Sequence, residues 1–133
     1  MEKKLSTSVK EFITPHLLTI AGDKTLHDAA SLMSSINIGS LVVEEDHHPV
    51  GIVTERDIIN AIAADIDLDA TLVGETMKKK LIAIESTLPV QEALLIMSKE
   101  NIRHLLVQEH GRYIGMFSFK NFLDLERLRI GIM

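Results

Sequence analysis

The feature that most constrains the fold is an internal repeat. The segment G-I-V-T-E-R-D at 51–57 returns in weaker form as G-M-F-S-F-K-N at 115–121, an offset of 64 residues (115 − 51). The same register holds without a gap from Val9 and Val73 to Ile59 and Leu123. Such self-similarity is typical of a fold built from repeated units that bury their apolar faces together. The residues of the first copy that recur unchanged are Val9, Glu11, Leu17, Ile20, Ala29, Met33, Ser34, Asn37, Ile38, Leu41, Val43, Glu45 and Gly51.

The repeat predicts two similar domains, 8–64 and 73–128, joined by a linker at 65–72. The chain has 133 residues, of which 46% are hydrophobic and 25% charged, an ordinary globular composition. A copy of about 60 residues buries little surface alone, so we expect the two copies to share a core. A site formed where they meet is a natural consequence.

Charge and composition exclude several classes of function. The net charge of −5 argues against nucleic-acid binding, which needs clustered basic residues on one face. The only basic run, 78–80, is short and is interpreted as a solvated connector. No apolar run is long enough to cross a membrane, and there are no cysteines. We therefore expect a soluble, cytoplasmic protein.

Hydrophobic periodicity and turn residues predict the order β-α-β-β-α in each copy, a mixed α/β (α+β) fold. In the first copy the expected elements are a strand at 17–20, a helix at 25–36 capped by Thr25 and closed by Asn37 or Gly39, strands at 40–44 and 50–53, and a helix at 55–64. Ile58, Ile59 and Ile62 are expected to face inward. In the second copy they are a strand at 81–84, a helix at 90–99, strands at 105–108 and 113–117, and a helix at 120–128. Short helical turns are expected at 9–13 and 72–77.

Metal binding and catalysis find little support. The acidic stretch D-I-D-L-D at 65–69 lacks the glycine and glutamate that a calcium loop needs at its sixth and twelfth positions. His47, His48 and His110 lie in expected hairpin turns without spaced carboxylates or cysteines. No phosphate loop, zinc-protease helix or nucleophile elbow is present. The sequence predicts a binding module, with no catalytic residue, no metal and no cofactor.

Thr54 and Asp57 are the strongest candidates for a site, and two interpretations of them stay open. The T-x-x-D spacing after a strand is typical of a capping box, in which threonine and acid close the start of a helix. The same geometry places a hydroxyl, free backbone N–H groups and a carboxylate together, which suits a phosphate and the cis-diol of a ribose. A cap that exchanges its partners when ligand arrives satisfies both.

Two further features, Gly51 and the pair Arg103 and His104, each have two possible interpretations. Gly51 inside a strand pattern marks either a close approach of a ligand or backbone, or a hairpin bulge. Arg103 and His104 occupy the register of Gly39 and Ser40. This basic pair is either a contact for an anion or a surface arginine beside a histidine in a polar pocket.

The chain resembles a tandem pair of cystathionine β-synthase (CBS) domains, over about residues 8–126. The resemblance depends on N-I-G-S-L-V-V with P-V-G-I-V-T-E-R-D in the first copy, and on N-I-R-H-L-L-V with Y-I-G-M-F-S-F-K-N in the second. It implies two β-α-β-β-α repeats packed with pseudo-two-fold symmetry, a homodimer, and clefts between repeats that bind adenosyl ligands.

The resemblance also implies which residues line the two clefts. Asp57 would hold the ribose hydroxyls, Thr54 would lie near ribose or phosphate, and Ile52 would line the base pocket. The opposite repeat would complete this cleft with Lys80, Leu81, Ile82, Arg103 and His104. The second cleft would use Ser118, Asn121, Thr14, His16, Leu17, Leu18, Gly39 and Ser40. It is expected to be the weaker, because the neutral Asn121 replaces an aspartate and the basic pair is missing.

The sequence therefore predicts a regulatory module that binds an adenine nucleotide and signals by conformational change to an effector protein that the sequence does not identify. Two alternatives remain: a structural dimerisation module whose T-x-x-D is only a cap, and a sensor of S-adenosylmethionine. The sequence does not choose among AMP, ADP, ATP, dinucleotides and S-adenosylmethionine.

Overall fold

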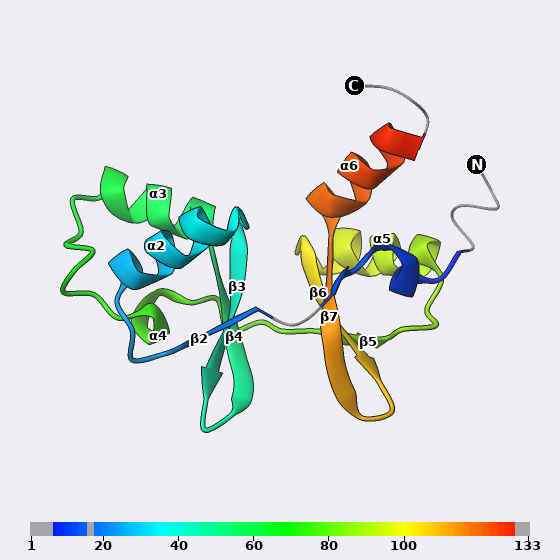
Figure 1. The fold of residues 1–133 in the computed structure, drawn as a ribbon, viewed down its shortest axis with the longest axis horizontal. Coiled ribbons are helices and arrows are strands. Elements are labelled where there is room, and N and C mark those ends of the chain that lie inside the picture. Colours follow the sequence, from blue (N-terminus) through cyan, green and yellow to red (C-terminus); the bar gives the residue numbers. More distant parts are fainter. Residues whose placement is uncertain (1–6, 16–17, 130–133) are drawn as a thin grey trace. The chain divides into compact units, whose positions relative to one another are not determined.

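The fold consists of two compact units of similar architecture (Figure 1). The computed structural model describes residues 7–15 and 18–129, with only the backbone for 14, 15, 128 and 129. Unit 2 is the continuous stretch Leu18–Leu81, and unit 1 combines Met1–Leu17 with Ile82–Met133. No helix in the described part of the chain is long and apolar enough to cross a membrane. The mixed α+β class predicted from the sequence is confirmed.

Unit 2 is a three-stranded sheet covered by helices. Its strands are β2 (Thr19–Ala21), β3 (Ser40–Glu45) and β4 (His48–Thr54), with β2 parallel and β4 antiparallel to the central β3. Its helices are α2 (Leu26–Ile36), α3 (Glu55–Ala63) and the short α4 (Val73–Thr76). Buried side chains of the sheet and the helices form one core, which includes Leu41, Val43, Val53, Leu26, Ala29, Ile58 and Val73.

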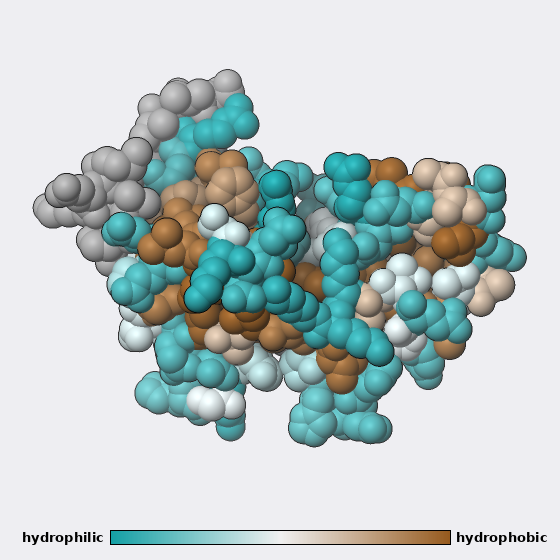
Figure 2. Space-filling view, turned by 180° about the vertical axis from the view of Figure 1, so that it is seen from behind, coloured by the Kyte–Doolittle hydropathy of each residue, from teal (hydrophilic) through white to brown (hydrophobic). Residues whose placement is uncertain are grey.

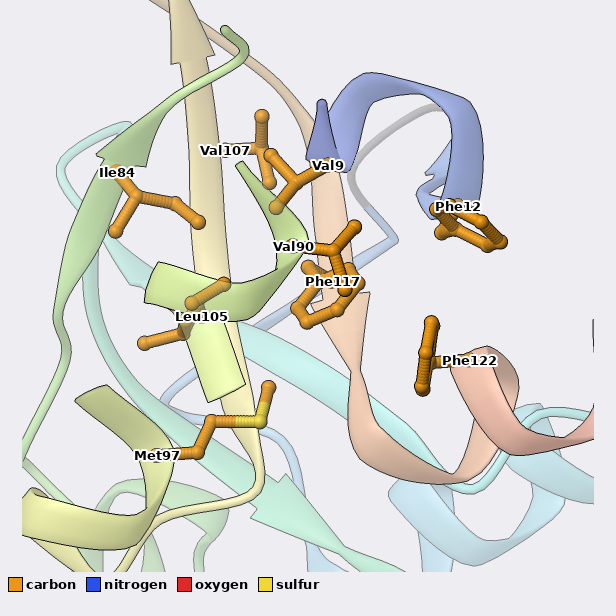
Figure 3. Close-up of a cluster of buried hydrophobic side chains, with 10 residues drawn as sticks. Val9, Phe12, Ile84, Val90, Met97, Leu105, Val107, Phe117 and Phe122 are labelled. Carbon is orange, nitrogen blue, oxygen red and sulfur yellow. The ribbon is translucent and has the colours of Figure 1, made fainter. Parts of the chain in front are cut away.

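Unit 1 repeats this plan and adds a strand at one edge. Its elements are the 3₁₀ turn η1 (Val9–Phe12), β1 (Thr14–Pro15), β5 (Ala83–Glu85), α5 (Val90–Glu100), β6 (His104–Glu109), β7 (Arg112–Ser118) and α6 (Phe119–Arg129). The sheet has the order β1-β7-β6-β5. In its core (Figure 3), the Phe12 ring meets the edge of Phe122 at 5.2 Å between centroids, and Phe117 lies 6.0 Å from Phe122.

The compact units do not coincide with the two sequence copies, because each unit contains the first segment of the other copy. The η1 segment belongs to the first copy but is fixed in unit 1, where Val9 N donates to Leu88 O at 2.8 Å. Likewise α4 belongs to the second copy but lies in unit 2, where Val73 N donates to Lys24 O at 2.7 Å. Val9 and Val73, identical residues 64 positions apart, are both fully buried. The boundaries 8–64 and 73–128 thus describe a repeat in sequence, and as domain boundaries they stay a prediction.

The limits of α2 follow from local signals in the sequence. Thr25 Oγ1 accepts from Asp28 N, and Asp28 Oδ2 accepts from Thr25 N, both at 3.0 Å, which is the reciprocal capping box. At the other end Asn37, one of the two residues that the sequence offered for closing the helix, adopts the left-handed conformation (φ 55°). Asn101 closes α5 in the same way (φ 54°).

Each unit also contains a tight hairpin with two residues of positive φ at its tip. These are Asp46 (51°) and His47 (64°) between β3 and β4, and His110 (54°) and Gly111 (77°) between β6 and β7. Two consecutive residues of this kind match the right-handed twist of the adjoining strands. Both tips appear as hydrophilic projections in Figure 2.

The prediction that Ile59 and Ile62 face inward is wrong. Their side chains are 55% and 58% exposed, and only Ile58 of the three is buried. The buried side of α3 consists of Asp57, Ile58 and Ala61. Ile59 and Ile62 form a second apolar row, rotated by about 100° from Ile58 and Ala61, and this helix buries only one of the two rows.

Candidate functional site

The candidate site of unit 2 lies where β4 passes into α3. Thr54 ends the strand, and its N–H and Oγ1 lie 2.9 and 3.1 Å from Asp57 Oδ2. Asp57 N donates in turn to Thr54 Oγ1 at 3.3 Å. The capping interpretation of T-x-x-D is therefore confirmed. It employs one oxygen of the carboxylate, Oδ2.

The second oxygen of this carboxylate faces a lysine. Lys78 Nζ lies 3.7 Å from Asp57 Oδ1, an ion pair longer than a hydrogen bond. The Asp57 side chain is 7% exposed, whereas that of Lys78 is 62% exposed. The sequence interpretation of 78–80 as a solvated connector missed this contact, because it joins residues that are far apart along the chain.

The backbone fixes the position of Lys78 beside β4. Ile52 and Lys78 exchange two hydrogen bonds, N to O in each direction, both at 2.9 Å. Ile52 itself is 6% exposed and lies two residues before Thr54. The stretch 52–57 and Lys78 thus form one local arrangement within unit 2.

Gly51 is needed because this returning segment passes directly against it. A Cβ atom at Gly51 would lie 2.6 Å from Met77 Sδ and 2.8 Å from Lys78 O, closer than real contacts allow. The β3–β4 register also shifts opposite Gly51, between Val43 and Glu44. Both interpretations of this glycine are correct, and the backbone that approaches it is the protein's own.

Gly39 and Ser40 lie in the same unit as Thr54 and Asp57. Ser40 pairs with Thr54 across β3 and β4 and is 8% exposed, and Gly39 O accepts from Glu55 N at 2.9 Å. The family resemblance predicts that they share a cleft with Ser118 and Asn121 of unit 1. That grouping, like every grouping across the two units, stays a prediction.

In unit 1 the equivalent junction joins β7 to α6. Asn121 N donates to Ser118 Oγ at 3.1 Å, and Ser118 is 6% exposed. His104 pairs with Ser118 across β6 and β7, and Phe119 N donates to Arg103 O at 3.0 Å. The Arg103 guanidinium carbon lies 5.8 Å from the centre of the Phe119 ring, a cation–π distance.

The remaining predicted site residues lie near the limits of the units. Leu18 O accepts from Val42 N (3.0 Å) and Ile82 O from Leu106 N (2.9 Å), equivalent bonds in the two units. Lys80 is exposed and Leu81 half-buried at the end of unit 2. The backbone of Thr14 pairs with Met116 in β7. His16 and Leu17 lie outside the described residues.

The acidic linker is attached to the start of α2. His27 Nδ1 lies 2.6 Å from Asp69 Oδ1, and Leu26 N donates to Thr71 O at 2.9 Å. Across residues 7–15 and 18–129, no three histidine, aspartate or glutamate side chains come together as metal ligands would. These acidic residues therefore anchor the chain locally.

Comparison with known proteins identifies relatives of this arrangement. A family model described as "CBS domain" matches residues 9–64 and again 73–127. An uncharacterised 17.7 kDa protein of Acidianus ambivalens is 32% identical over 96% of this chain and 80% of its own length.

Two solved structures extend the comparison. The hexameric CBS-CP12 protein of bloom-forming cyanobacteria has a TM-score of 0.80 and 30% identity over 90% of this chain and 67% of its own. The CBS domain pair of protein MJ0100, in complex with 5′-methylthioadenosine and S-adenosyl-L-methionine, has a TM-score of 0.78 and 26% identity over 92% of this chain and 98% of its own.

Proposed function

Because the chain belongs to the CBS domain family, and its two CBS domains form a regulatory ligand-binding module, we propose that its ligand is an adenosyl compound of the AMP, ADP or ATP class. One observation carries the proposal. Asp57 is buried, fixed by the cap through Oδ2, and directs Oδ1 toward an exposed lysine at 3.7 Å, beyond hydrogen-bond distance. A carboxylate held in this way is an acceptor for a ribose hydroxyl.

The ligand contacts within unit 2 form the core of the proposal. Asp57 accepts from the ribose, Thr54 lies near ribose or phosphate, and Ile52 offers an apolar contact to the base. Lys80 and Leu81 of unit 2, with Ile82, Arg103 and His104 of unit 1, are proposed to complete the site, Arg103 and His104 toward phosphate. The second site, with Ser118 and Asn121, is proposed to be weaker.

The proposed role is regulation without catalysis or a cofactor. Ligand shifts the population between two conformations by the difference in its affinity for them, and an effector protein responds to the favoured one. We propose the cytoplasm as the location, since a chain without cysteine suits a reducing compartment.

S-adenosylmethionine is a second candidate ligand, because the MJ0100 domain pair contains it together with methylthioadenosine. Both compounds share the adenosyl group with the nucleotides. They differ in carrying no phosphate, which makes them separable by experiment.

We also propose that the protein self-associates, and that a second copy of the chain packs on the exposed apolar row of α3. Ile59 and Ile62 lie three residues apart on the same side of that helix, and both are more than half exposed. The similar CBS-CP12 protein is hexameric. The same row also supports the alternative function, a structural dimerisation module that binds no ligand.

The test compares two capping boxes that differ in their surroundings. Thermal unfolding of the wild type, Asp57→Asn and Asp28→Asn is followed with AMP, ADP, ATP, NAD and S-adenosylmethionine. Asp28 forms the same reciprocal cap at the start of α2, outside the candidate site, so it controls for loss of a cap. Ligand at about a hundred times its Kd adds about 2.7 kcal/mol, or several degrees in Tm.

The expected result is a shift in Tm with at least one ligand in the wild type and in Asp28→Asn, and a clearly smaller shift in Asp57→Asn, where only weaker binding remains. A shift with S-adenosylmethionine alone selects the second candidate. Absence of any shift in the wild type would leave the structural module as the function.

A further inference from the structure

Lys78 combines a fixed backbone with a movable charge. Two backbone hydrogen bonds to Ile52 hold its main chain against β4, while its side chain is 62% exposed. A lysine side chain has a flexible four-carbon stem with a compact ammonium group at its end. The ammonium group can therefore leave Asp57 without any movement of the backbone.

The partner of Lys78 is the oxygen that a ribose needs. Asp57 Oδ2 already lies near two donor groups of Thr54, so only Oδ1 accepts a ribose hydroxyl without breaking the cap. Lys78 occupies the Oδ1 side at 3.7 Å. Ligand and lysine consequently compete for one oxygen.

The second copy supports the pairing of these two charges. The positions equivalent to Asp57 and Lys78, 64 residues away in the repeat register, are Asn121 and Thr14. The backbone of Thr14 pairs with Met116 as that of Lys78 pairs with Ile52. One copy thus has both charges and the other has neither, as expected if each charge depends on the other.

Displacement of the ammonium group has a cost that depends on the ligand. A buried carboxylate that loses its cation is destabilised unless the hydroxyl replaces that interaction, and the freed ammonium gains from a nearby anion. A ligand with phosphate supplies that anion, whereas adenosine does not. Lys78 would then contribute to selectivity for phosphate.

We propose that Lys78 determines specificity: it balances the charge of Asp57 in the empty site and moves to the phosphate when an adenine nucleotide binds. This inference rests on the proposed function and specifies the ligand further, as phosphorylated rather than as a bare adenosine group.

The test is calorimetric titration of the full chain with AMP and with adenosine. The variants are Lys78→Met, which keeps the length of the stem without the charge, Lys78→Arg, which keeps a cation, and Lys79→Met, which removes the same charge from the neighbouring exposed residue. Both lysines are exposed, and thermal unfolding of each variant checks that it remains folded.

We expect Lys78→Met to reduce the ratio of AMP to adenosine affinity about tenfold, the scale of one charge-assisted contact, with adenosine binding unchanged or tighter. Lys78→Arg and Lys79→Met should keep the ratio of the wild type. An unchanged ratio in Lys78→Met, with nucleotide still bound, would overturn this inference alone. Failure of the wild type to bind either compound or any nucleotide would overturn the proposed function, and the inference with it.

Discussion

At the scale of single residues, the two units differ around one glutamate. In unit 1, Glu109 Oε2 accepts from Lys10 Nζ at 2.9 Å and from Ser86 Oγ at 2.7 Å. The hydrogen bond from Lys10, followed by that from Ser86, holds the pKa of Glu109 below its ordinary value of 4.5. The equivalent residues of unit 2 are Glu45, Gly74 and Gly22, and a Cβ at Gly22 would lie 2.6 Å from Glu45 Oε2. The carboxylate of Glu109 thus accepts hydrogen bonds from side chains of unit 1, whereas glycines leave space for the equivalent carboxylate of Glu45 in unit 2.

Glu109→Gln is expected to lower the free energy of unfolding near neutral pH. A lowered folded-state pKa means that the ionised glutamate stabilises the fold above about pH 4.5, and that this contribution is lost as pH falls through the folded-state value. Urea unfolding between pH 7 and pH 3 measures the difference between wild type and variant, which should shrink toward the acid end. Glu45→Gln is the matched control, and a Glu109→Gln difference independent of pH would contradict the argument.

At the scale of elements, η1 shows how strongly a short segment is tied to a distant part of the chain. Phe12 is 2% exposed and packs against Phe122 of α6, although the two residues belong to different sequence copies. The equivalent position in unit 2, at the end of α4, is Thr76. The η1 segment therefore contributes to unit 1 an aromatic side chain that α4 does not contribute to unit 2.

Phe12→Ala is expected to destabilise unit 1 by about 3–5 kcal/mol, the usual cost of removing a buried phenylalanine. Hydrogen exchange should locate the loss of protection in α5, α6 and β7 rather than in α2 and β3. Thr76→Ala at the equivalent position is the control, with a much smaller effect. Equal loss of protection in both units would mean that the two do not respond separately.

The elements that could be predicted from the sequence are those with local signals. The T-x-x-D spacings set the starts of α2 and α3, Asn37 ends α2, and the hairpins form where short polar turns separate apolar runs. The exchange of η1 and α4 could not be predicted, because an internal repeat shows which segments are alike and not which unit each one joins. For the same reason the Lys78–Asp57 contact was missed, since a run of three lysines reads locally as a solvated surface.

At the scale of the whole molecule, the exposed row on α3 makes self-association testable. Ile59→Glu is expected to weaken self-association, because a carboxylate is costly to bury in an apolar interface. Asn60→Glu adds the same charge at the adjacent exposed position and is the control. Sedimentation velocity over a range of concentrations measures both, and an unaltered assembly in Ile59→Glu would exclude this row as the interface.

The two copies are also expected to bind ligand unequally. Asn121 offers a neutral amide where Asp57 offers a charge-assisted acceptor, a difference of about 1 kcal/mol or more. Titration with AMP should therefore resolve one stronger class of site, and Asp57→Asn should convert it to the weaker class. Loss of both classes in Asp57→Asn would indicate a single site.

The placement of η1 in unit 1 and of α4 in unit 2 also has a consequence for synthesis of the chain. Unit 2 is continuous and has all its residues once Leu81 has been translated, so it can fold while the rest is being made. Unit 1 needs η1, which is translated before unit 2, to meet β5 to α6, which are translated after it. The η1 segment is thus translated before unit 2 but reaches its place after it, and Phe12 stays without its aromatic partner until Phe122 has been added.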